Sequence, residues 1–254
     1  MMTTTLNLGY IPLTDAAPLL VAAELGYFEQ AGLDIRLHRE HAWSTLRDKT
    51  ELGLLDASHM LAPMAGPAGN TRFTPMATLS MGGNGITVAA HHGPPERPTF
   101  AVPFPQSNHH AELLGWLDRA GLRDAAEVIV LAPPDMPEAL RRGEIDGMCV
   151  GEPWNTAAEA SGWGRVVASG RALYPRGARP YPEKVLGTTP AWLTAHPEAA
   201  AALGAALASA ADWLADPTHA PAAADLLAAP QHLDVPASLL LPALTGARAD
   251  LRWR

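Results

Sequence analysis

The sequence predicts an α/β protein built from two similar lobes with a cleft between them. One observation is the pattern Gly-x-aliphatic-Asp-small, which occurs at residues 53–57 and again at residues 143–147. Another is the triplet Ala-Gly-Leu, which occurs at residues 31–33 and 120–122. The copies of the first pattern lie 90 residues apart and those of the second lie 89 apart. An apolar strand and an amphipathic helix precede each triplet, so one supersecondary plan is used twice.

The bulk composition is that of an ordinary globular protein. The chain has 254 residues, 48% of them apolar and 17% charged, enough for two modest domains. A net charge of −8 without any basic run argues against nucleic acid as a direct ligand. The single cysteine, Cys149, rules out an internal disulfide and a multi-cysteine metal site. The N-terminus has no secretory pattern and no long apolar run suggests a membrane span, so we expect a cytoplasmic protein, or a periplasmic one if a leader was removed.

Alternating and helical hydrophobic patterns predict the elements in order. Thr14 or Asp15 can cap the first helix and Ser44 the next one. Leu203, Leu207 and Leu214 share one face of a long alanine-rich helix that starts near residue 197. Strands are expected at residues 6–11, 34–38, 86–90, 99–104, 128–131, 148–150, 163–168 and 183–189. The apolar run at 128–131 is expected to be a buried strand.

The boundaries between the lobes are predicted from helix and strand breakers. Four glycines and prolines fall within residues 91–98, where we place the crossing to the second lobe. The strand 183–189 leads back to the first lobe. Residues 1–92 are therefore expected to begin lobe one, residues 93–187 to form lobe two, and residues 188–254 to complete lobe one with C-terminal helices.

The stretch 143–154 is the first candidate for a binding site. It reads as a helix end, a turn, a buried strand and a new helix near Pro153. The N–H groups of Gly151 and Glu152 would then point out of a strand end at a helix N-terminus, a geometry that binds small anions. The alternative is a plain strand-to-helix turn.

Other candidates carry hydrogen-bond donors or allow close backbone approach. Trp43 precedes a predicted helix and is either a core anchor or a cleft residue. Residues 82–85, Gly-Gly-Asn-Gly, let a backbone approach a ligand but lack the spacing of a phosphate-binding loop. Residues 106–110 form a donor-rich strand-to-helix junction, where His109 and His110 either serve a site or lie in a solvated first turn. Lys184 is either an exposed lysine or a cation where the chain re-crosses between the lobes.

Six motifs occur in order along nearly the whole chain. They are Gly-Tyr-Ile-Pro-Leu-Thr-Asp from residue 9, Trp-x-x-x-Arg-Asp from 43, His-Met-Leu-Ala-Pro-Met from 59, Gly-Asn-Gly-Ile from 83, Val-Gly-Glu-Pro-Trp from 150 and Pro-Glu-Lys-Val-Leu-Gly from 182. These motifs resemble those of the nitrate- and bicarbonate-binding solute receptors of ABC transporters, and within that family they are most similar to the cytoplasmic nitrate/nitrite sensors of bacterial nitrate assimilation. The resemblance implies a type II periplasmic-binding-protein fold, in which a two-stranded hinge joins two α/β lobes.

The resemblance also implies an anion site between the lobes. Trp43 would donate its indole N–H, Gly151 a backbone N–H, and Lys184 would supply the positive charge. A few fixed donors and one cation match a planar monovalent anion such as nitrate. No cofactor or resident metal is expected, although in a bicarbonate receptor Glu152 could help hold Ca²⁺. The implied lining is Trp43, Asn84, Gly85, Gln106, Ser107, Gly151, Glu152 and Lys184.

Of two departures from the family pattern, the first favours the sensor branch and the second leaves partner binding open. The strand 101–104 lacks the histidine that some transport receptors carry there, and the chain ends soon after residue 238, earlier than most family members. We therefore expect nitrate or nitrite to close the cleft and release an RNA-binding antiterminator protein. The alternative is a solute-binding subunit that delivers nitrate or bicarbonate to an ABC permease. An enzyme is not expected, because Cys149 lies in an apolar strand where thiols are usually inert.

Overall fold

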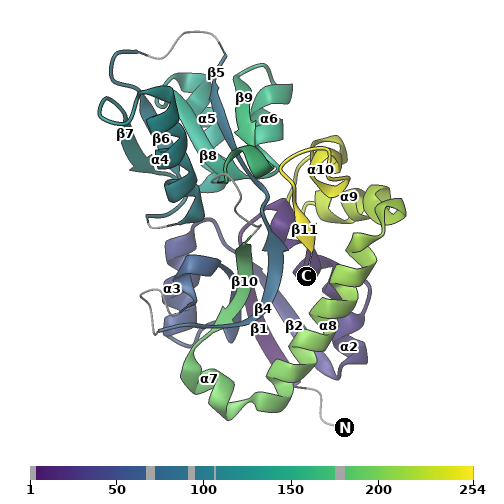
Figure 1. Cartoon of the computed structure of the whole chain (residues 1–254). Helices are drawn as coiled ribbons and strands as arrows, with labels where there is room; N and C mark the ends of the chain where they lie inside the picture. The colour runs from purple at the N-terminus through teal and green to yellow at the C-terminus, as the bar shows by residue number, and fades with distance from the viewer. Residues whose placement is uncertain (1–3, 67–71, 91–94, 106, 175–180, 254) are drawn as a thin grey trace.

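The computed structural model describes residues 4–66, 72–90, 95–105, 107–174 and 181–253. Figure 1 shows two lobes, each built on its own β-sheet. Within the described residues the first sheet runs in the order β11 (Arg252–Trp253), β4 (Thr74–Met81), β10 (Pro182–Thr188), β3 (Ala57–Leu61), β1 (Thr4–Tyr10) and β2 (Leu33–Arg39). The second runs in the order β7 (Glu127–Val130), β6 (Thr99–Val102), β8 (Gly147–Gly151), β5 (Asn84–Ala89) and β9 (Gly164–Ser169).

The duplicated plan predicted from the sequence is confirmed in both sheets. In lobe one, β1 pairs in parallel with β2 on one side and β3 on the other. In lobe two, β6 pairs in parallel with β7 and β8 in the same way. Each sheet is then extended on its third-strand side by antiparallel strands, β10 and β4 in lobe one, β5 and β9 in lobe two.

The repeated aspartate has the same structural role in each lobe. The Asp56 N–H donates to the Asn7 carbonyl at 2.8 Å, and its carboxylate accepts the Asn7 N–H at 2.7 Å. Asp146 makes the same pair with Thr99, at 2.7 and 2.8 Å. The first glycine of each repeat has a φ near +70° and ends the preceding helical turn. The pattern therefore marks the turn that ties the third strand of each lobe to its first.

The chain crosses to lobe two earlier than the breakers predicted. β4 belongs to the first sheet and β5 to the second, so the crossing lies at Gly82 and Gly83 rather than at residue 92. Both glycines have positive φ, of 67° and 104°, and a Cβ on either would lie 2.9 Å from the C-terminal segment. The breakers at 95–98 instead lie between β5 and β6, two strands of one sheet.

The return crossing also differs from the predicted boundary. β10 lies in the first sheet, so the chain has returned to lobe one by Pro182 rather than after residue 187. Residues 91–94, where the first expected boundary falls, lie outside the described residues.

Helices cover both sheets. In lobe two, Leu113 and Leu117 of α4 pack under β6 and β8. In lobe one the predicted alanine-rich helix is α8, whose Leu203, Leu207 and Leu214 are all buried against α1 and the sheet. No helix in the described part of the chain is long and apolar enough to span a bilayer. The helices are α1 (Ala17–Glu24), α2 (Tyr27–Gln30), α3 (Trp43–Glu51), α4 (Asn108–Ala120), α5 (Met136–Arg142), α6 (Trp154–Ala160), α7 (Pro190–Ala195), α8 (Pro197–Ala215), α9 (Ala220–Ala228) and α10 (Ala237–Leu244).

Three local expectations are wrong. Ser44 does not cap α3, which begins at Trp43 with Ala42 before it, and neither Thr14 nor Asp15 caps a helix through its side chain. The strand expected to be buried at residues 128–131 is β7, an edge strand that pairs only with β6 among the described strands, and its Val130 is 51% exposed. Apolar residues on an edge strand look like those of a central strand when only the sequence is read.

Candidate ligand site between the lobes

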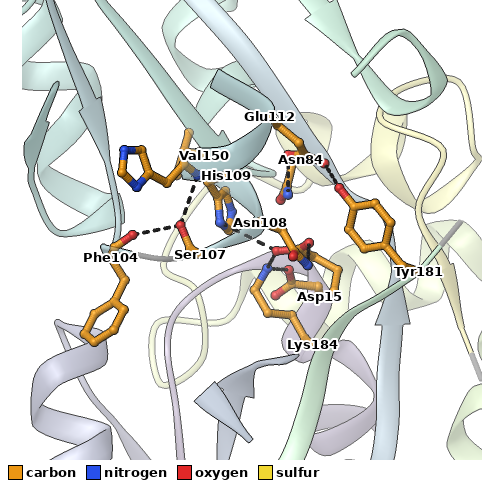
Figure 2. Close-up of polar contacts among 12 residues, drawn as sticks. Asp15, Asn84, Phe104, Ser107, Asn108, His109, Glu112, Val150, Tyr181 and Lys184 are labelled. Carbon is orange, nitrogen blue, oxygen red and sulfur yellow. Dashed lines mark hydrogen bonds and ion pairs between the residues drawn. The ribbon is translucent and has the colours of Figure 1, made fainter. Parts of the chain in front are cut away.

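Polar side chains from both lobes, most of them buried, meet between the lobes, and Figure 2 shows most of them. Lobe one contributes side chains from the 3₁₀ turn η1 (Thr14–Ala16), α3, β3 and β10, and lobe two contributes them from β5 and α4. We call this group the inter-lobe cluster. Its members are Asp15, Trp43, His59, Asn84, Asn108, His109, Glu112, Tyr181, Glu183 and Lys184.

Two neighbouring residues of β10 reach the cluster together. Successive residues of a regular strand point to opposite faces, but the pairing of β10 with β4 shifts register on both sides of Lys184. Glu183 and Lys184 are both fully buried, and the Lys184 Nζ lies 3.0 Å from the Glu183 Oε1. The irregular pairing thus accompanies the placement of a carboxylate and an ammonium in one buried group.

Lys184 is buried but is not a free cation. Its Nζ also lies 2.8 Å from the Asp15 Oδ2, so two carboxylates surround one ammonium. Burial by itself would raise the pKa of Asp15, but the Lys184 charge and the nearby His59 outweigh it and hold the pKa far below its usual range. Burial likewise opposes the charge on Lys184, while Asp15 and Glu183 outweigh it and raise its pKa. The positive charge expected for an anion is therefore already offset within the protein.

His59, on β3, is buried beside Asp15 without a regular hydrogen bond. Its Nε2 lies 3.2 Å from the Asp15 Oδ1, yet neither ring nitrogen has a partner of good geometry. A hydrogen bond weakens steeply as its angle departs from linear, so the short distance alone does not make a hydrogen bond here. Burial is the main cause that lowers the pKa of His59, so its ring is neutral at neutral pH.

His109 faces lobe one from the start of α4. Ser107 caps this helix, accepting the His110 N–H at 3.1 Å, and so fixes the first turn. The His109 Nδ1 lies 3.6 Å from the Glu183 Oε1, beyond hydrogen-bond distance, and both ring nitrogens are buried without a partner. Burial lowers the pKa of His109 to about 4. Next to it, the Asn108 Nδ2 donates to the Glu183 Oε2 at 2.7 Å and links the two lobes.

Glu112, one turn further along α4, is held as a neutral acid. Burial and the Glu183 charge raise its pKa to about 8. The Asn84 Nδ2 donates to its Oε2 at 2.8 Å, and the Tyr181 hydroxyl donates to its Oε1. Asn84 therefore lies in the cluster, where its amide N–H bonds a protein group, while its Oδ1 has no partner.

Trp43 offers an unused donor to the cluster. Its side chain is buried at the start of α3, and its Nε1–H has no hydrogen-bond partner. Its ring lies edge-on to His59 at 5.0 Å and has the Lys184 Nζ 5.8 Å from its centroid. A buried N–H without a partner costs about 1–3 kcal/mol. Together with the histidine nitrogens, it makes an unsatisfied set that a small acceptor could complete.

Three other lobe-two residues were predicted to line the ligand site, and none of them is seen to offer a free group to the cluster. Gly85 does not adjoin the cluster's side chains: it pairs with Val150, and a Cβ on it would lie 3.0 Å from the Asn155 Nδ2. Ser107 uses its hydroxyl in the cap of α4 and in a bond to the Phe104 carbonyl at 2.8 Å. Gln106 lies outside the described residues.

Gly151 ends β8 and Glu152 follows it, but the Glu152 backbone N–H is not free to bind a ligand. A Cβ on Gly151 would lie 3.5 Å from the Asp15 Oδ2, so this glycine adjoins the cluster. The Glu152 N–H, expected to be free, donates to the Gly83 carbonyl at 3.2 Å. The Glu152 carboxylate accepts the Thr156 N–H at 3.0 Å, and burial raises its pKa.

Sequence reasoning missed five cluster residues as site residues: Asp15, His59, Glu112, Tyr181 and Glu183. His109 was named as a site residue in one of two readings. Asp15 was taken for a helix cap, and His59 and Glu183 were noted only as parts of family motifs. A usable signal existed for Asp15, because a carboxylate in an otherwise apolar stretch, Ile-Pro-Leu-Thr-Asp-Ala-Ala, calls for a buried partner.

The described part of the chain has neither a group of side chains that could hold a metal ion nor an activated thiol. In the part of the chain that the structure covers, no three His, Cys, Asp or Glu side chains are arranged to hold a metal ion. Cys149 is buried, and burial raises the pKa of its thiol, so it is not an activated nucleophile. A surface pocket of about 240 Å³ between α2 and α8 holds no charged side chain and lies away from the cluster.

Comparisons with known proteins agree with the fold and the kind of site. The model of the NMT1-like family matches residues 2–228. The nitrate import ATP-binding protein NrtC and the bicarbonate transport ATP-binding protein CmpC, both from Synechocystis sp., are each 34% identical over 84% of this chain. Those matches cover only 35% and 36% of the two relatives, so the chain spans about a third of their length.

A solved structure is similar over nearly the whole chain. The periplasmic nitrate-binding protein NrtA from Synechocystis PCC 6803 superposes with a TM-score of 0.86 at 25% identity, covering 96% of this chain and 70% of that protein. The predicted periplasmic-binding-protein fold and the resemblance to nitrate- and bicarbonate-binding receptors are confirmed. The binding proteins among the relatives also agree with the expectation that the chain is not an enzyme.

Proposed function

The chain belongs to the NMT1-like family, and we propose that it binds nitrate or nitrite at the inter-lobe cluster. The observation that carries the proposal is the unpartnered Nε1–H of Trp43, buried beside the Lys184 ammonium and the His59 imidazole. The similarity to a nitrate-binding protein of known structure supports the same ligand class.

The donors of the cluster suit a small, flat oxyanion. Nitrate has three acceptor oxygens in one plane and spreads a single charge over them. Trp43 offers one N–H, and His59 and His109 each offer one in their neutral form. Hydrogen bonds to a charged group are worth about 1.5–3 kcal/mol each, so three of them give useful affinity without a free cation.

For the biological role we propose a cytoplasmic sensor of nitrate assimilation. A ligand held between two lobes stabilises the closed shape, and differential affinity for the two shapes is what drives a switch. In this proposal the Asn108–Glu183 hydrogen bond, which joins the two lobes, belongs to the closed shape. The partner in this proposal is an RNA-binding antiterminator protein that is released when the anion binds.

A second role is delivery of nitrate or bicarbonate to an ABC permease. The names of the relatives favour it, since they describe nitrate import and bicarbonate transport. The two roles make opposite demands on location, because a transport receptor works outside the cytoplasmic membrane. Fractionation of cells that produce the native protein separates them: recovery with periplasmic proteins would overturn the sensor role, and recovery with cytoplasmic proteins would overturn transport.

The ligand is tested by calorimetric titration with nitrate, nitrite, bicarbonate with and without Ca²⁺, and an alkanesulfonate. We expect nitrate or nitrite to bind, and Trp43→Phe to weaken it. Trp213→Phe is the matched control, because Trp213 stacks on His219 at 4.4 Å in lobe one, away from the cluster. Bicarbonate binding that requires Ca²⁺, or no anion binding at all, would contradict the proposal.

A further inference from the structure

The inter-lobe cluster carries more negative than positive charge when it holds no ligand. Asp15 and Glu183 are ionised and Lys184 is the ammonium between them, which leaves a surplus of one negative charge. His59 and His109 are neutral. A monovalent anion added to this buried group would double the surplus, and an uncompensated buried charge is costly.

The groups that face His109 leave few candidates for a compensating charge. β10 presents Glu183 and Lys184, and η1 presents Asp15. Its own helix carries Glu112, which is already protonated at neutral pH, and β8 carries the neutral Cys149 thiol. β3 carries His59, which is neutral. Two kinds of group can therefore still take up a proton. The histidines can do so directly, whereas Asp15 and Glu183 would lose their ion pairs with Lys184.

The geometry distinguishes His109 from His59. His59 and its neighbour Asp15 both belong to lobe one, so their contact does not depend on how the lobes meet. His109 belongs to lobe two, and its Nδ1 faces Glu183 of lobe one at 3.6 Å. A neutral imidazole has one N–H and can serve either Glu183 or a ligand, whereas an imidazolium has two and can serve both.

We propose that anion binding is coupled to the uptake of one proton by His109, so that the site takes the anion and a proton together. The proposal rests on the proposed function, since it concerns the same ligand. Protonated His109 then bridges the bound anion and Glu183 across the two lobes. Net charge in the cluster is the same before and after binding.

The expected size of the effect places it in a measurable range. Burial lowers the pKa of His109 to about 4 while the site is empty. A monovalent anion about 4 Å from the ring, at an effective dielectric constant of about 20, increases its proton affinity about a thousandfold. Protonation in the complex thus moves into the neutral range. The anion's affinity must then fall as pH rises, by up to about tenfold per pH unit.

The test is a count of protons per bound anion. Purified protein in weakly buffered solution with a pH indicator is mixed with saturating sodium nitrate at several pH values between 6 and 8, and calorimetry gives the Kd under the same conditions. We expect wild type to take up close to one proton per nitrate at pH 6, and its Kd to increase with pH. His109→Gln should take up none and show a flat Kd. His110→Gln, the neighbouring control, should behave as wild type.

Each outcome decides a different claim. Nitrate binding without proton uptake in the wild type overturns this inference and leaves the proposed function standing, and it requires no variant to fold. Uptake that persists in His109→Gln and disappears in His59→Gln overturns the assignment to His109. No binding of nitrate or nitrite at any pH overturns the proposed function together with the inference.

Discussion

Replacing Lys184 with methionine should destabilise the protein strongly, even without ligand. The ammonium lies 2.8 Å from Asp15 and 3.0 Å from Glu183, and all three side chains are at most 3% exposed. Removing one partner of a buried ion pair typically costs about 3–5 kcal/mol, because the remaining charge stays buried. Here two carboxylates lose their counterion, so we expect the upper part of that range at pH 7.5.

The loss should depend on pH in a defined direction. In the wild type the pKa of Asp15 is depressed, so its stabilising contribution is present above the usual carboxyl pKa and is lost only in strong acid. In the variant the unpaired carboxylates can take protons as the pH falls. The difference in unfolding free energy between wild type and variant should therefore shrink from pH 7.5 to pH 5.

Urea denaturation followed by far-UV circular dichroism measures this difference. Lys49→Met is the matched control: its Nζ lies 2.6 Å from Glu40, but its side chain is 41% exposed, so its loss should cost less than about 1 kcal/mol. Asp15→Asn added to Lys184→Met should recover part of the stability. If Lys184→Met cost no more than Lys49→Met, or the same at both pH values, the buried ion group would be refuted.

Three further predictions test separate parts of the structure. Trp43→Phe should leave the unfolding free energy nearly unchanged and weaken nitrate about 10–100-fold in calorimetry, since the lost N–H has no protein partner; equal affinity would contradict this. Glu112 holds a proton when folded that it has lost when unfolded, so wild-type stability should fall by up to about 1.4 kcal/mol per unit of pH between about 5 and 8, and Glu112→Gln should flatten this slope; a parallel slope would be evidence against a neutral Glu112. Asp146→Asn should cost about 1 kcal/mol in urea denaturation, because it weakens a charge-assisted bond to the Thr99 N–H, and the exposed Asp124→Asn should cost less than about 0.5.

The sequence was most informative where a local pattern has a local cause. The paired Gly-x-aliphatic-Asp motifs predicted two equivalent lobes because the glycine ends a helix and the aspartate binds the backbone of the first strand. Leu203, Leu207 and Leu214 predicted the buried face of α8 for the same reason, since a helical period is a property of one segment.

The site was harder to predict because its partners come together only in the fold. Nothing near Asp15 in the chain indicates that its carboxylate meets Lys184, 169 positions later. The direction of the His109 ring depends on how Ser107 starts α4 and on where β10 lies in the other lobe. The crossing at Gly82 and Gly83 was missed because the prolines further on gave a stronger local signal. The position of Lys184 was predicted, but its two carboxylate partners were not.

A crystal structure of the protein with nitrate tests the central claim most directly. The claim is that the ligand completes the unpartnered donors of the inter-lobe cluster. We predict the anion within hydrogen-bond distance of the Trp43 Nε1 and the His109 ring, with the Lys184 pairs to Asp15 and Glu183 still in place. Nitrate bound elsewhere, or a cluster whose Trp43 N–H stays without a partner in the complex, would contradict the account.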